Sequence, residues 1–175
     1  MLFALILTIT ESMILIAATR WFPDQIYLVS VASAITAIVM VRWGWYASIH
    51  AVLSGVIMCL IMGGSLQQYA IYCIGNLMGL MALPLIKKIG VNKICDNAIL
   101  RILYGALVLV LMQTGRALIS LAFGNGIGDV LSFYLTDALS LVFTAVILWV
   151  AGNQDGILED QREYVVRIQQ AEGTV

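Results

Sequence analysis

Charged residues are scarce in this chain. Only 11% of its 175 residues are Asp, Glu, Lys or Arg, whereas 62% are hydrophobic, and the mean hydropathy is +0.99. A typical soluble domain carries about 25% charged residues. So few charged side chains could not cover the surface of a water-soluble protein, so the composition indicates an integral membrane protein.

The residues that several functional classes require are also missing. The three cysteines, Cys59, Cys73 and Cys95, follow no metal-binding or redox spacing, and their odd number argues against a disulfide framework. The net charge of −1 comes without the basic patch that nucleic-acid binding needs. No nucleophile lies at a useful spacing from a base, and "GNGIGD" (Gly124–Asp129) joins two apolar segments as a turn. The sequence therefore predicts neither an enzyme nor a metal, cofactor or nucleic-acid site.

Six apolar segments stand between the polar and Gly/Pro-containing breaks. A helix of about 20 apolar residues crosses the roughly 30 Å of hydrocarbon in a bilayer. The sequence thus predicts an all-α membrane protein, a compact bundle of six transmembrane helices within residues 1–151. A five-span alternative would make the second or third segment re-entrant. The segments are Leu2–Thr19, Ile26–Val41, Trp43–Met62, Tyr69–Ile86, Ile99–Phe123 and Val130–Ala151.

Lysine and arginine set the predicted orientation, because they are enriched in cytoplasmic loops. With a cytoplasmic N-terminus, Arg20 alone falls on the outer side and Arg116 falls inside the membrane. The other seven of the nine basic residues then share the inner side, which places both termini in the cytoplasm. These seven are Arg42, Lys87, Lys88, Lys93, Arg101, Arg162 and Arg167.

Residues 152–175 form a predicted cytoplasmic tail. In "GILEDQREYVVRIQQ" the apolar residues Ile157, Leu158, Tyr164, Val165 and Ile168 recur at roughly helical spacing, with Glu163 and Arg167 four residues apart on another face. The pattern predicts a short amphipathic helix at the membrane surface or against a partner. A solvated helix with no binding role is the alternative.

Four strongly polar residues lie at one predicted depth on four different segments. Glu11, Asn76, Arg116 and Asp137 each stand seven or eight residues inside the outer end of their segment. At 1.5 Å per residue this is about 10–12 Å below the outer surface. Each charge buried near a helix centre costs at least about 2.5–3.5 kcal/mol, so we expect Arg116 to point inward and meet Glu11, Asp137 or both. Ser54 lies at the same level, and Gln113 one turn deeper.

This polar layer has two interpretations. It is either a structural ion-pair network or a ligand site near the outer face, as intramembrane ionisable groups often are. Its formal charge of −1 suits a ligand that donates hydrogen bonds or carries positive charge. The nearby aromatic residues Tyr72, Phe133 and Tyr134 could stack on a planar ring, although an interfacial belt would also use them. The ligand-site hypothesis comprises Glu11, Tyr72, Asn76, Gln113, Arg116, Tyr134 and Asp137.

Two further features stand out along the helices. Ala4, Thr8 and Ser12 recur every four residues, and such small-residue faces allow close helix approach, either to another membrane protein or within the chain. Gly75 and Gly79 repeat the pattern beside Asn76, where packing within the chain is expected. The single histidine, His50, falls near mid-membrane, where a hydrogen bond between helices is expected and a proton relay is the alternative.

Three stretches of the sequence carry a family resemblance: "RWGWYASIHAVLSGVI" (Arg42–Ile57), "YCIGNLMGL" (Tyr72–Leu80) and the tail "DGILEDQREYVVRIQ". In these stretches, and over nearly its whole length, the chain resembles the substrate-binding (S) components of energy-coupling factor transporters, which import vitamins and related micronutrients. The family's alanine repeat on the first helix is replaced here by Ala4, Thr8 and Ser12.

The resemblance implies a high-affinity site for a small vitamin-like ligand near the outer face of a prokaryotic plasma membrane. It also implies a gating loop that includes Trp21, Phe22 and Pro23, and docking of a transmembrane coupling subunit on the first helix. Two partner ATPases would then hydrolyse ATP to drive ligand release inside.

A second resemblance supports a different class. "FPDQIYLV" followed by two tightly joined segments is also similar to the membrane scaffold of the rod-shape complex, which builds cell wall and transports nothing. That alternative predicts that the chain binds protein partners and no small ligand. It would be favoured if the ion pair of Arg116 served only to hold helices together.

Overall fold

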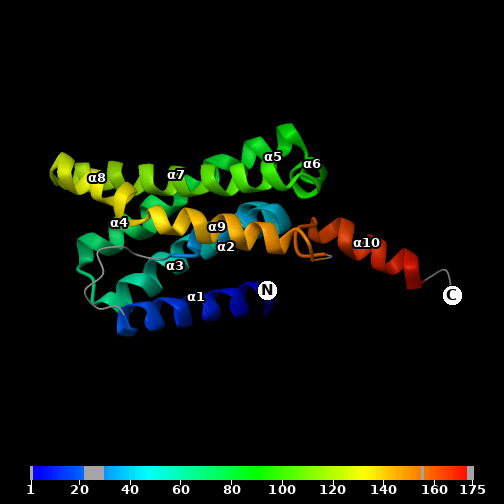
Figure 1. The fold of residues 1–175 in the computed structure, drawn as a ribbon, viewed down its shortest axis with the longest axis horizontal. Helices are drawn as coiled ribbons and strands as arrows, with labels where there is room; N and C mark the ends of the chain where they lie inside the picture. The colour runs from blue at the N-terminus through cyan, green and yellow to red at the C-terminus, as the bar shows by residue number, and fades with distance from the viewer. Residues whose placement is uncertain (1, 22–29, 155, 173–175) are drawn as a thin grey trace.

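The computed structural model describes residues 2–21, 30–154 and 156–172, and their regular structure is entirely helical (Figure 1). Some side chains at the start of α1 and in α10 lie outside this description. The α-helices are α1 Leu2–Trp21, α2 Ala32–Trp43, α3 Ala47–Met62, α4 Leu66–Leu77, α5 Leu83–Ile89, α6 Val91–Asp96, α7 Ala98–Ala122, α8 Ile127–Thr136, α9 Ala138–Ala151 and α10 Gln161–Glu172, with 3₁₀ turns η1 Gly44–Tyr46 and η2 Met78–Ala82.

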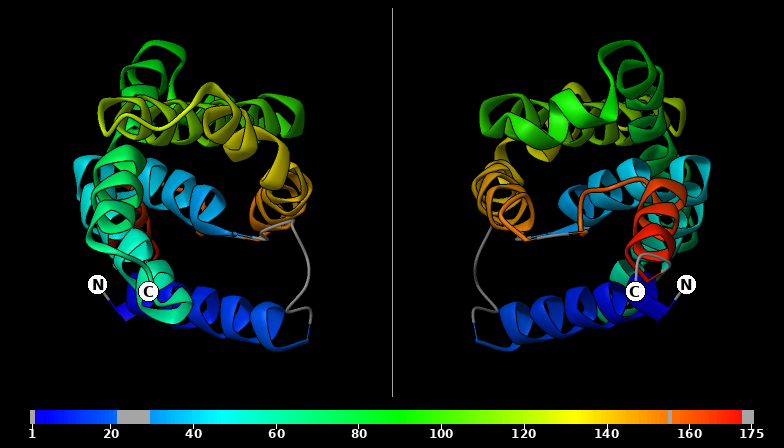
Figure 2. Two further views of the ribbon diagram at one scale, coloured as in Figure 1. Left: turned by 90° about the vertical axis from the view of Figure 1, so that its left-hand side faces the viewer. Right: turned by 90° about the vertical axis from the view of Figure 1, so that its right-hand side faces the viewer.

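The helices run along the long axis of an elongated bundle. Viewed along that axis, α1 lies at one edge, α7 and α8 lie at the opposite edge, and α2 and α9 lie between them (Figure 2). The start of α1, the α2–α3 turn, α5, α6 and α10 lie at one end, which we call the α10 end (Figure 1). The end of α1, the α3–α4 turn and α8 lie at the opposite end, the α8 end.

Four helical runs in the described residues are long and apolar enough to cross a membrane, so the chain is a multi-pass membrane protein. The helix α1, with 20 residues, also has sufficient length. The four runs are Ala32–Met62, Leu66–Ile89, Ala98–Ala122 and Ile127–Ala151.

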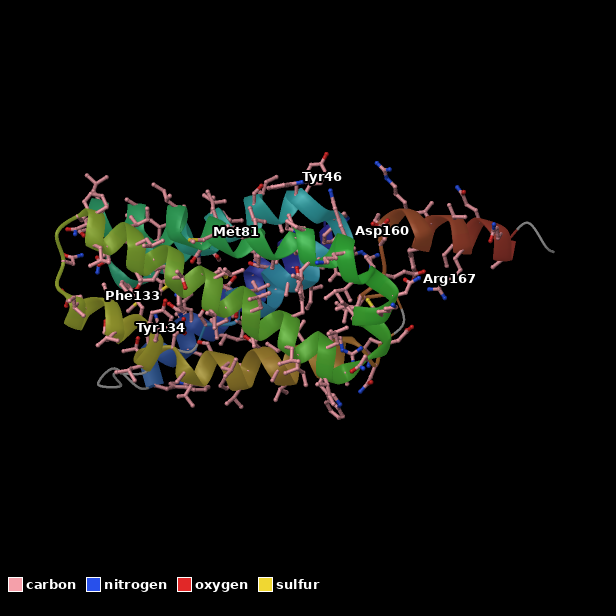
Figure 3. All side chains as sticks on the ribbon, turned by 90° about the horizontal axis from the view of Figure 1, so that it is seen from above. Tyr46, Met81, Phe133, Tyr134, Asp160 and Arg167 are labelled. Carbon is pink, nitrogen blue, oxygen red and sulfur yellow. The ribbon has the colours of Figure 1, made fainter. Side chains whose placement is uncertain are left out.

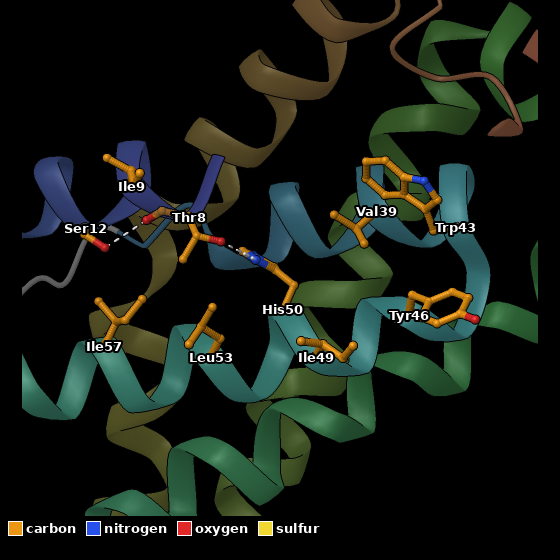
Figure 4. A pocket seen from close by; sticks show the side chains of 10 residues that line it. All are labelled: Thr8, Ile9, Ser12, Val39, Trp43, Tyr46, Ile49, His50, Leu53 and Ile57. Carbon is orange, nitrogen blue, oxygen red and sulfur yellow. Dashed lines mark hydrogen bonds between the residues drawn. The ribbon is translucent and has the colours of Figure 1, made fainter. Parts of the chain in front are cut away.

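The longest of these runs, Ala32–Met62, is not one straight span, because it reverses direction at Gly44 into arms of 12 and 16 residues, each shorter than the roughly 20 residues of a full crossing. This glycine has a φ of 60°, which side-chain-bearing residues rarely adopt. In Figure 4 the chain runs one way from Val39 to Trp43 and back the other way from Tyr46 to Ile57. The two segments that are tightly joined in the sequence therefore form an antiparallel pair, with α2 and α3 as its two arms.

Two segments that the sequence analysis treated as continuous helices are interrupted. The helix α4 starts on a capping box, in which Ser65 and Gln68 bond each other's backbone, but it gives way to η2 directly after Asn76 and Leu77. The run Ile127–Ala151 breaks at Asp137, between α8 and α9. Interruptions within membrane spans are tolerated where they are buried in protein or line a cavity.

Close packing of α4 on α7 fixes where Asn76 and Arg116 lie. A β-carbon added at Gly75 would lie 2.6 Å from the backbone nitrogen of Arg116, and one added at Gly115 would collide with the carbonyl oxygen of Gly75. One added at Gly79 would lie 2.8 Å from Met112 Cγ. The glycines thus let the two backbones touch, which confirms the predicted packing role of Gly75 and Gly79.

The predicted tail helix begins later than the sequence pattern indicated. Ile157 and Leu158 precede α10, and Leu158 is buried in the same apolar core as α2 and α7. Cys95 Sγ donates to the Leu158 carbonyl at 2.6 Å, and Arg42 donates to the carbonyl of Gly156. Arg167 pairs with Glu159 at 2.7 Å, and the side chain of its predicted partner Glu163 lies outside the described residues. From this anchor α10 extends beyond the bundle (Figure 1).

Candidate functional site

Arg116 is the centre of a buried group of polar side chains. Its Nε donates to Asn76 Oδ1 at 2.8 Å, and its Nη1 donates to Asp137 Oδ2 at 3.1 Å and to Gln113 Oε1 at 3.4 Å. Only 4% of its surface is exposed. The inward orientation and the ion pair with Asp137 predicted from the sequence are both present. We call Asn76, Gln113, Arg116 and Asp137 the Arg116 cluster.

Asp137 interrupts its span and uses both carboxylate oxygens. Oδ2 accepts from Gln113 as well as from Arg116, and Oδ1 accepts from the Ser140 hydroxyl one turn later. The Ser140 hydroxyl in turn accepts from the backbone N–H of Ser30 at 2.9 Å. The carboxylate at the helix break is therefore bonded on both sides, and this network extends to the entry of α2.

Asn76 links the cluster to a third helix. Its Nδ2 donates to the Ala51 carbonyl at 3.1 Å and to the Ser54 hydroxyl at 3.3 Å, both on α3. The predicted location of Ser54 at the level of Asn76 is confirmed. Helices α3, α4 and α7 and the α8–α9 junction thus meet through one set of hydrogen bonds, as the shared depth of these residues predicted.

Aromatic rings cover one side of the guanidinium. The Tyr72 ring centroid lies 4.9 Å from Arg116 Cζ, within cation–π range, and Phe133 meets Tyr72 edge-on at 6.2 Å and 81°. Tyr134 points elsewhere: its hydroxyl bonds Thr114 Oγ1 at 3.0 Å and the residue is 39% exposed. Phe133 and Tyr134 both lie at the α8 end (Figure 3), and Phe133 is the one that meets Tyr72.

Glu11 lies apart from this network. Its Oε2 faces His50 Nε2 at 3.6 Å, whereas Arg116 bonds Asp137. His50 Nδ1 also bonds Thr8 Oγ1 at 3.2 Å. The predicted layer therefore forms two groups, the Arg116 cluster and a His50 cluster of Thr8, Glu11 and His50 that joins α1 to α3.

The small-residue face of α1 is directed partly toward its own chain. Thr8 is buried against α3, and the Ser12 hydroxyl donates to the Thr8 carbonyl at 2.8 Å. The side chain of Ala4 lies outside the described residues. This geometry matches the packing alternative raised for the repeat. Of the proposed gating residues, Trp21 is exposed at the end of α1, and Phe22 and Pro23 lie outside the described residues.

An apolar groove, which was not predicted from the sequence, lies between α1 and the α2–α3 hairpin (Figure 4). Its volume is about 610 Å³. His50 and Thr8 contribute polar groups to an otherwise largely apolar wall, and Trp43 and Tyr46 close the end nearest the turn at Gly44. In the sequence most of the lining residues look like ordinary apolar residues of separate helices. They form one groove only because α1 lies beside the α2–α3 hairpin. The remaining lining residues are Ile9, Ser12, Val39, Ile49, Leu53 and Ile57.

Within the described ranges, no three His, Cys, Asp or Glu side chains gather closely enough to hold a metal ion. The chain matches no protein-family model, and no curated protein and no solved structure matches it.

Proposed function

We propose that the chain spans the plasma membrane of a prokaryote six times, with both termini in the cytoplasm. The distribution of basic residues supports this orientation. The α10 end carries the α2–α3 turn with Arg42, the α5–α6 region with its three lysines, and α10 with Arg162 and Arg167. The opposite end carries Arg20 at the end of α1. An excess of Lys and Arg on one side is typical of the cytoplasmic face.

We further propose that the chain is the substrate-binding component of an energy-coupling factor type importer. One observation carries this proposal: two spans are interrupted beside Asn76 and at Asp137, and both residues bond the same buried guanidinium. Interrupted spans with buried ionisable residues are typical of transporter binding sites. The site lies toward the α8 end, the outer side in the proposed orientation.

The surroundings of Arg116 favour a small ligand with a planar ring. The Tyr72 ring faces the guanidinium, and Phe133 packs edge-on against Tyr72. A planar ligand ring that stacks on these side chains would make an aromatic contact in place of one that the chain makes with itself. Gln113, Asn76 and Asp137 offer amide and carboxylate groups that can bond a ligand when it replaces some of the hydrogen bonds these side chains make with one another and with Arg116. A water-soluble vitamin or vitamin precursor has these features. Release inside would require a coupling subunit and two ATPases.

A panel of ring-containing vitamins tests this proposal by thermal unfolding of the purified chain. A ligand present at 100 times its Kd stabilises a protein by about 2.7 kcal/mol. We expect one ligand class to raise the unfolding temperature of the wild type but not of Tyr72→Leu. The matched control is Tyr46→Leu, which alters an exposed tyrosine at the α10 end and should keep the response. No response to any compound, or an equal response in both variants, would count against the site.

The scaffold alternative is supported by a different observation. Within the described residues each polar side chain of the Arg116 cluster has a hydrogen-bond partner in the chain, and the groove lies elsewhere, between α1 and the α2–α3 hairpin. A self-satisfied network is typical of a structural ion pair. For a scaffold, we expect no vitamin to shift unfolding, and we expect the chain to be recovered from membranes with cell-wall synthesis proteins after mild crosslinking.

A further inference from the structure

The Glu11–His50 pair is buried but incompletely bonded. Glu11 is 8% exposed and His50 is 4% exposed. Glu11 Oε2 and His50 Nε2 face each other at 3.6 Å, beyond the usual 2.7–3.2 Å of an N–H···O hydrogen bond. Among the described residues neither atom has a hydrogen-bond partner. The Arg116 cluster uses neither side chain, so this pair needs an explanation of its own.

Charge balance in the pair requires one proton. An ionised Glu11 beside a neutral His50 would leave a net charge inside an apolar bundle, which is costly. A single added proton removes that net charge, whether it rests on the imidazole or on the carboxyl group. In both arrangements one N–H or O–H then lies between the two facing atoms and can donate to the other.

Thr8 can accommodate either arrangement. Its hydroxyl lies 3.2 Å from His50 Nδ1, the ring nitrogen that does not face Glu11. A hydroxyl can donate to an unprotonated ring nitrogen or accept from a protonated one. With the proton bound, Nδ1 is protonated in both arrangements and donates to Thr8; once the proton leaves, Nε2–H faces Glu11 and the Thr8 hydroxyl donates to Nδ1. The contact is therefore satisfied with and without the proton, and it keeps the ring oriented toward the carboxyl group.

No other charge on the described helices around the pair replaces this proton. Arg116 is bonded to Asp137 at 3.1 Å. Arg20 is exposed at the end of α1, and Arg42 is bonded to Gln161 at the α10 end. Besides the pair itself, the ionisable side chains on the described parts of α1, α2, η1 and α3 are Arg20, Arg42, Tyr46 and Cys59.

The groove between α1 and the α2–α3 hairpin gives the pair a route for exchange. His50 and Thr8 both form part of its wall, and Figure 4 shows the imidazole directed from α3 toward Thr8 on α1. The groove measures about 610 Å³, and water is held there only beside the polar groups of its largely apolar wall, among them those of His50 and Thr8. A proton can therefore reach His50 without passing through the packed core around α7.

We propose that Glu11 and His50 form a site that binds and releases one proton on the groove side of the α1–α3 contact, and that the bound proton removes the net charge buried between the two helices. The chemical ligand of the site is the proton itself, with water in the groove as donor and acceptor. The proposal rests on the His50 cluster alone, so it stands or falls independently of the micronutrient site at Arg116.

Since His50 is the only histidine, isotope labelling reports on it without interference. We would label the full chain with ¹⁵N-histidine, reconstitute it in lipid nanodiscs and record the ring nitrogen signals between about pH 4 and 9, the range in which histidines usually titrate. We expect the wild-type signals to change in a single step. In Glu11→Gln the midpoint of that step should move by more than about one pH unit, because the ionisable partner is gone.

Two further variants make the result decisive. Glu159→Gln changes a carboxylate that pairs with Arg167 at the α10 end, so its midpoint should equal that of the wild type. Glu11→Asp keeps a carboxyl group one methylene further away and should shift the midpoint even if Glu11→Gln does not fold. A wild-type signal that stays constant over the whole range would overturn the proposal. So would equal midpoints in the wild type and the folded Glu11 variant, or a shift of equal size in Glu159→Gln.

Discussion

The Arg116 cluster and the His50 cluster are both buried polar groups between membrane helices, but the chain satisfies them to different degrees. Arg116 bonds three side chains, and both oxygens of Asp137 accept hydrogen bonds. In the His50 cluster, Glu11 Oε2 and His50 Nε2 lack a hydrogen-bond partner among the described residues. The first cluster joins tightly packed helices at two span interruptions, whereas the second joins α1 to the bundle beside an open groove. This difference in hydrogen bonding is why we propose proton exchange at the His50 cluster and not at the Arg116 cluster.

Removing Arg116 should have the largest effect of any single substitution in either cluster. Arg116→Ala leaves the Asp137 carboxylate buried without its counter-ion, and breaking a buried pair in this way typically costs about 3–5 kcal/mol. Thermal unfolding in detergent measures the loss. The double variant Arg116→Met with Asp137→Leu removes both charges, so it should recover most of the stability; no recovery would contradict the ion-pair explanation.

Gly115→Ala should weaken the Arg116 cluster through the backbone. The added methyl group would collide with the Gly75 carbonyl and push α4 away from α7, and such overpacking typically costs about 1–3 kcal/mol. The matched control is Gly128→Ala on α8, where nothing lies within 4 Å of the added carbon. Unfolding temperatures of the two variants give the comparison, and equal values would show that α4 and α7 are not packed as closely as described.

His50→Leu should affect α1 more than the rest of the bundle. The substitution removes the partner of Glu11 and of Thr8, and lost buried hydrogen bonds typically cost about 1–3 kcal/mol. Amide hydrogen exchange should increase in α1 but stay unchanged in α7. Uniform acceleration in both helices would mean that His50 supports the whole bundle instead of the attachment of α1.

Thr8→Val should have the smallest effect of the four. Valine has nearly the shape of threonine but cannot bond His50 Nδ1, so the expected loss is about 0.5–1.5 kcal/mol, typical of one hydrogen bond. Ser12→Ala is a control, because the Ser12 hydroxyl bonds only the backbone of its own helix among the contacts of the described residues. The ring nitrogen signals of His50 should change in Thr8→Val and not in Ser12→Ala.

Much of the architecture could be predicted from the sequence because hydropathy governs membrane insertion. The apolar segment lengths gave the helical class, and the near-absence of a linker around Gly44 gave the α2–α3 hairpin. Counting residues from the segment ends brought Asn76, Arg116 and Asp137 to one depth, and their hydrogen bonds bear this out. Depth alone does not tell which way a side chain points around its helix axis. The sequence therefore left open whether Glu11 meets Arg116, whereas in the structure it faces His50.

Other features depend on tertiary packing that a single sequence does not encode locally. The break at Asp137 occurs within an apolar run and reflects side-chain bonds to α7 rather than any glycine or proline. The burial of Leu158 depends on Cys95 and Arg42, which are distant in sequence, so the helical spacing of the tail was misleading at its start. The groove arises only where α1 meets the hairpin.

Native mass spectrometry of the purified chain, with wild type and Tyr72→Leu compared, tests most directly whether the Arg116 cluster is a ligand site. We expect the wild type to retain a small molecule of vitamin-like mass and Tyr72→Leu to lose it, while Tyr46→Leu retains it. A folded wild type that remains empty after incubation with the full vitamin panel would rule out the ligand site and leave Arg116 as a structural ion pair.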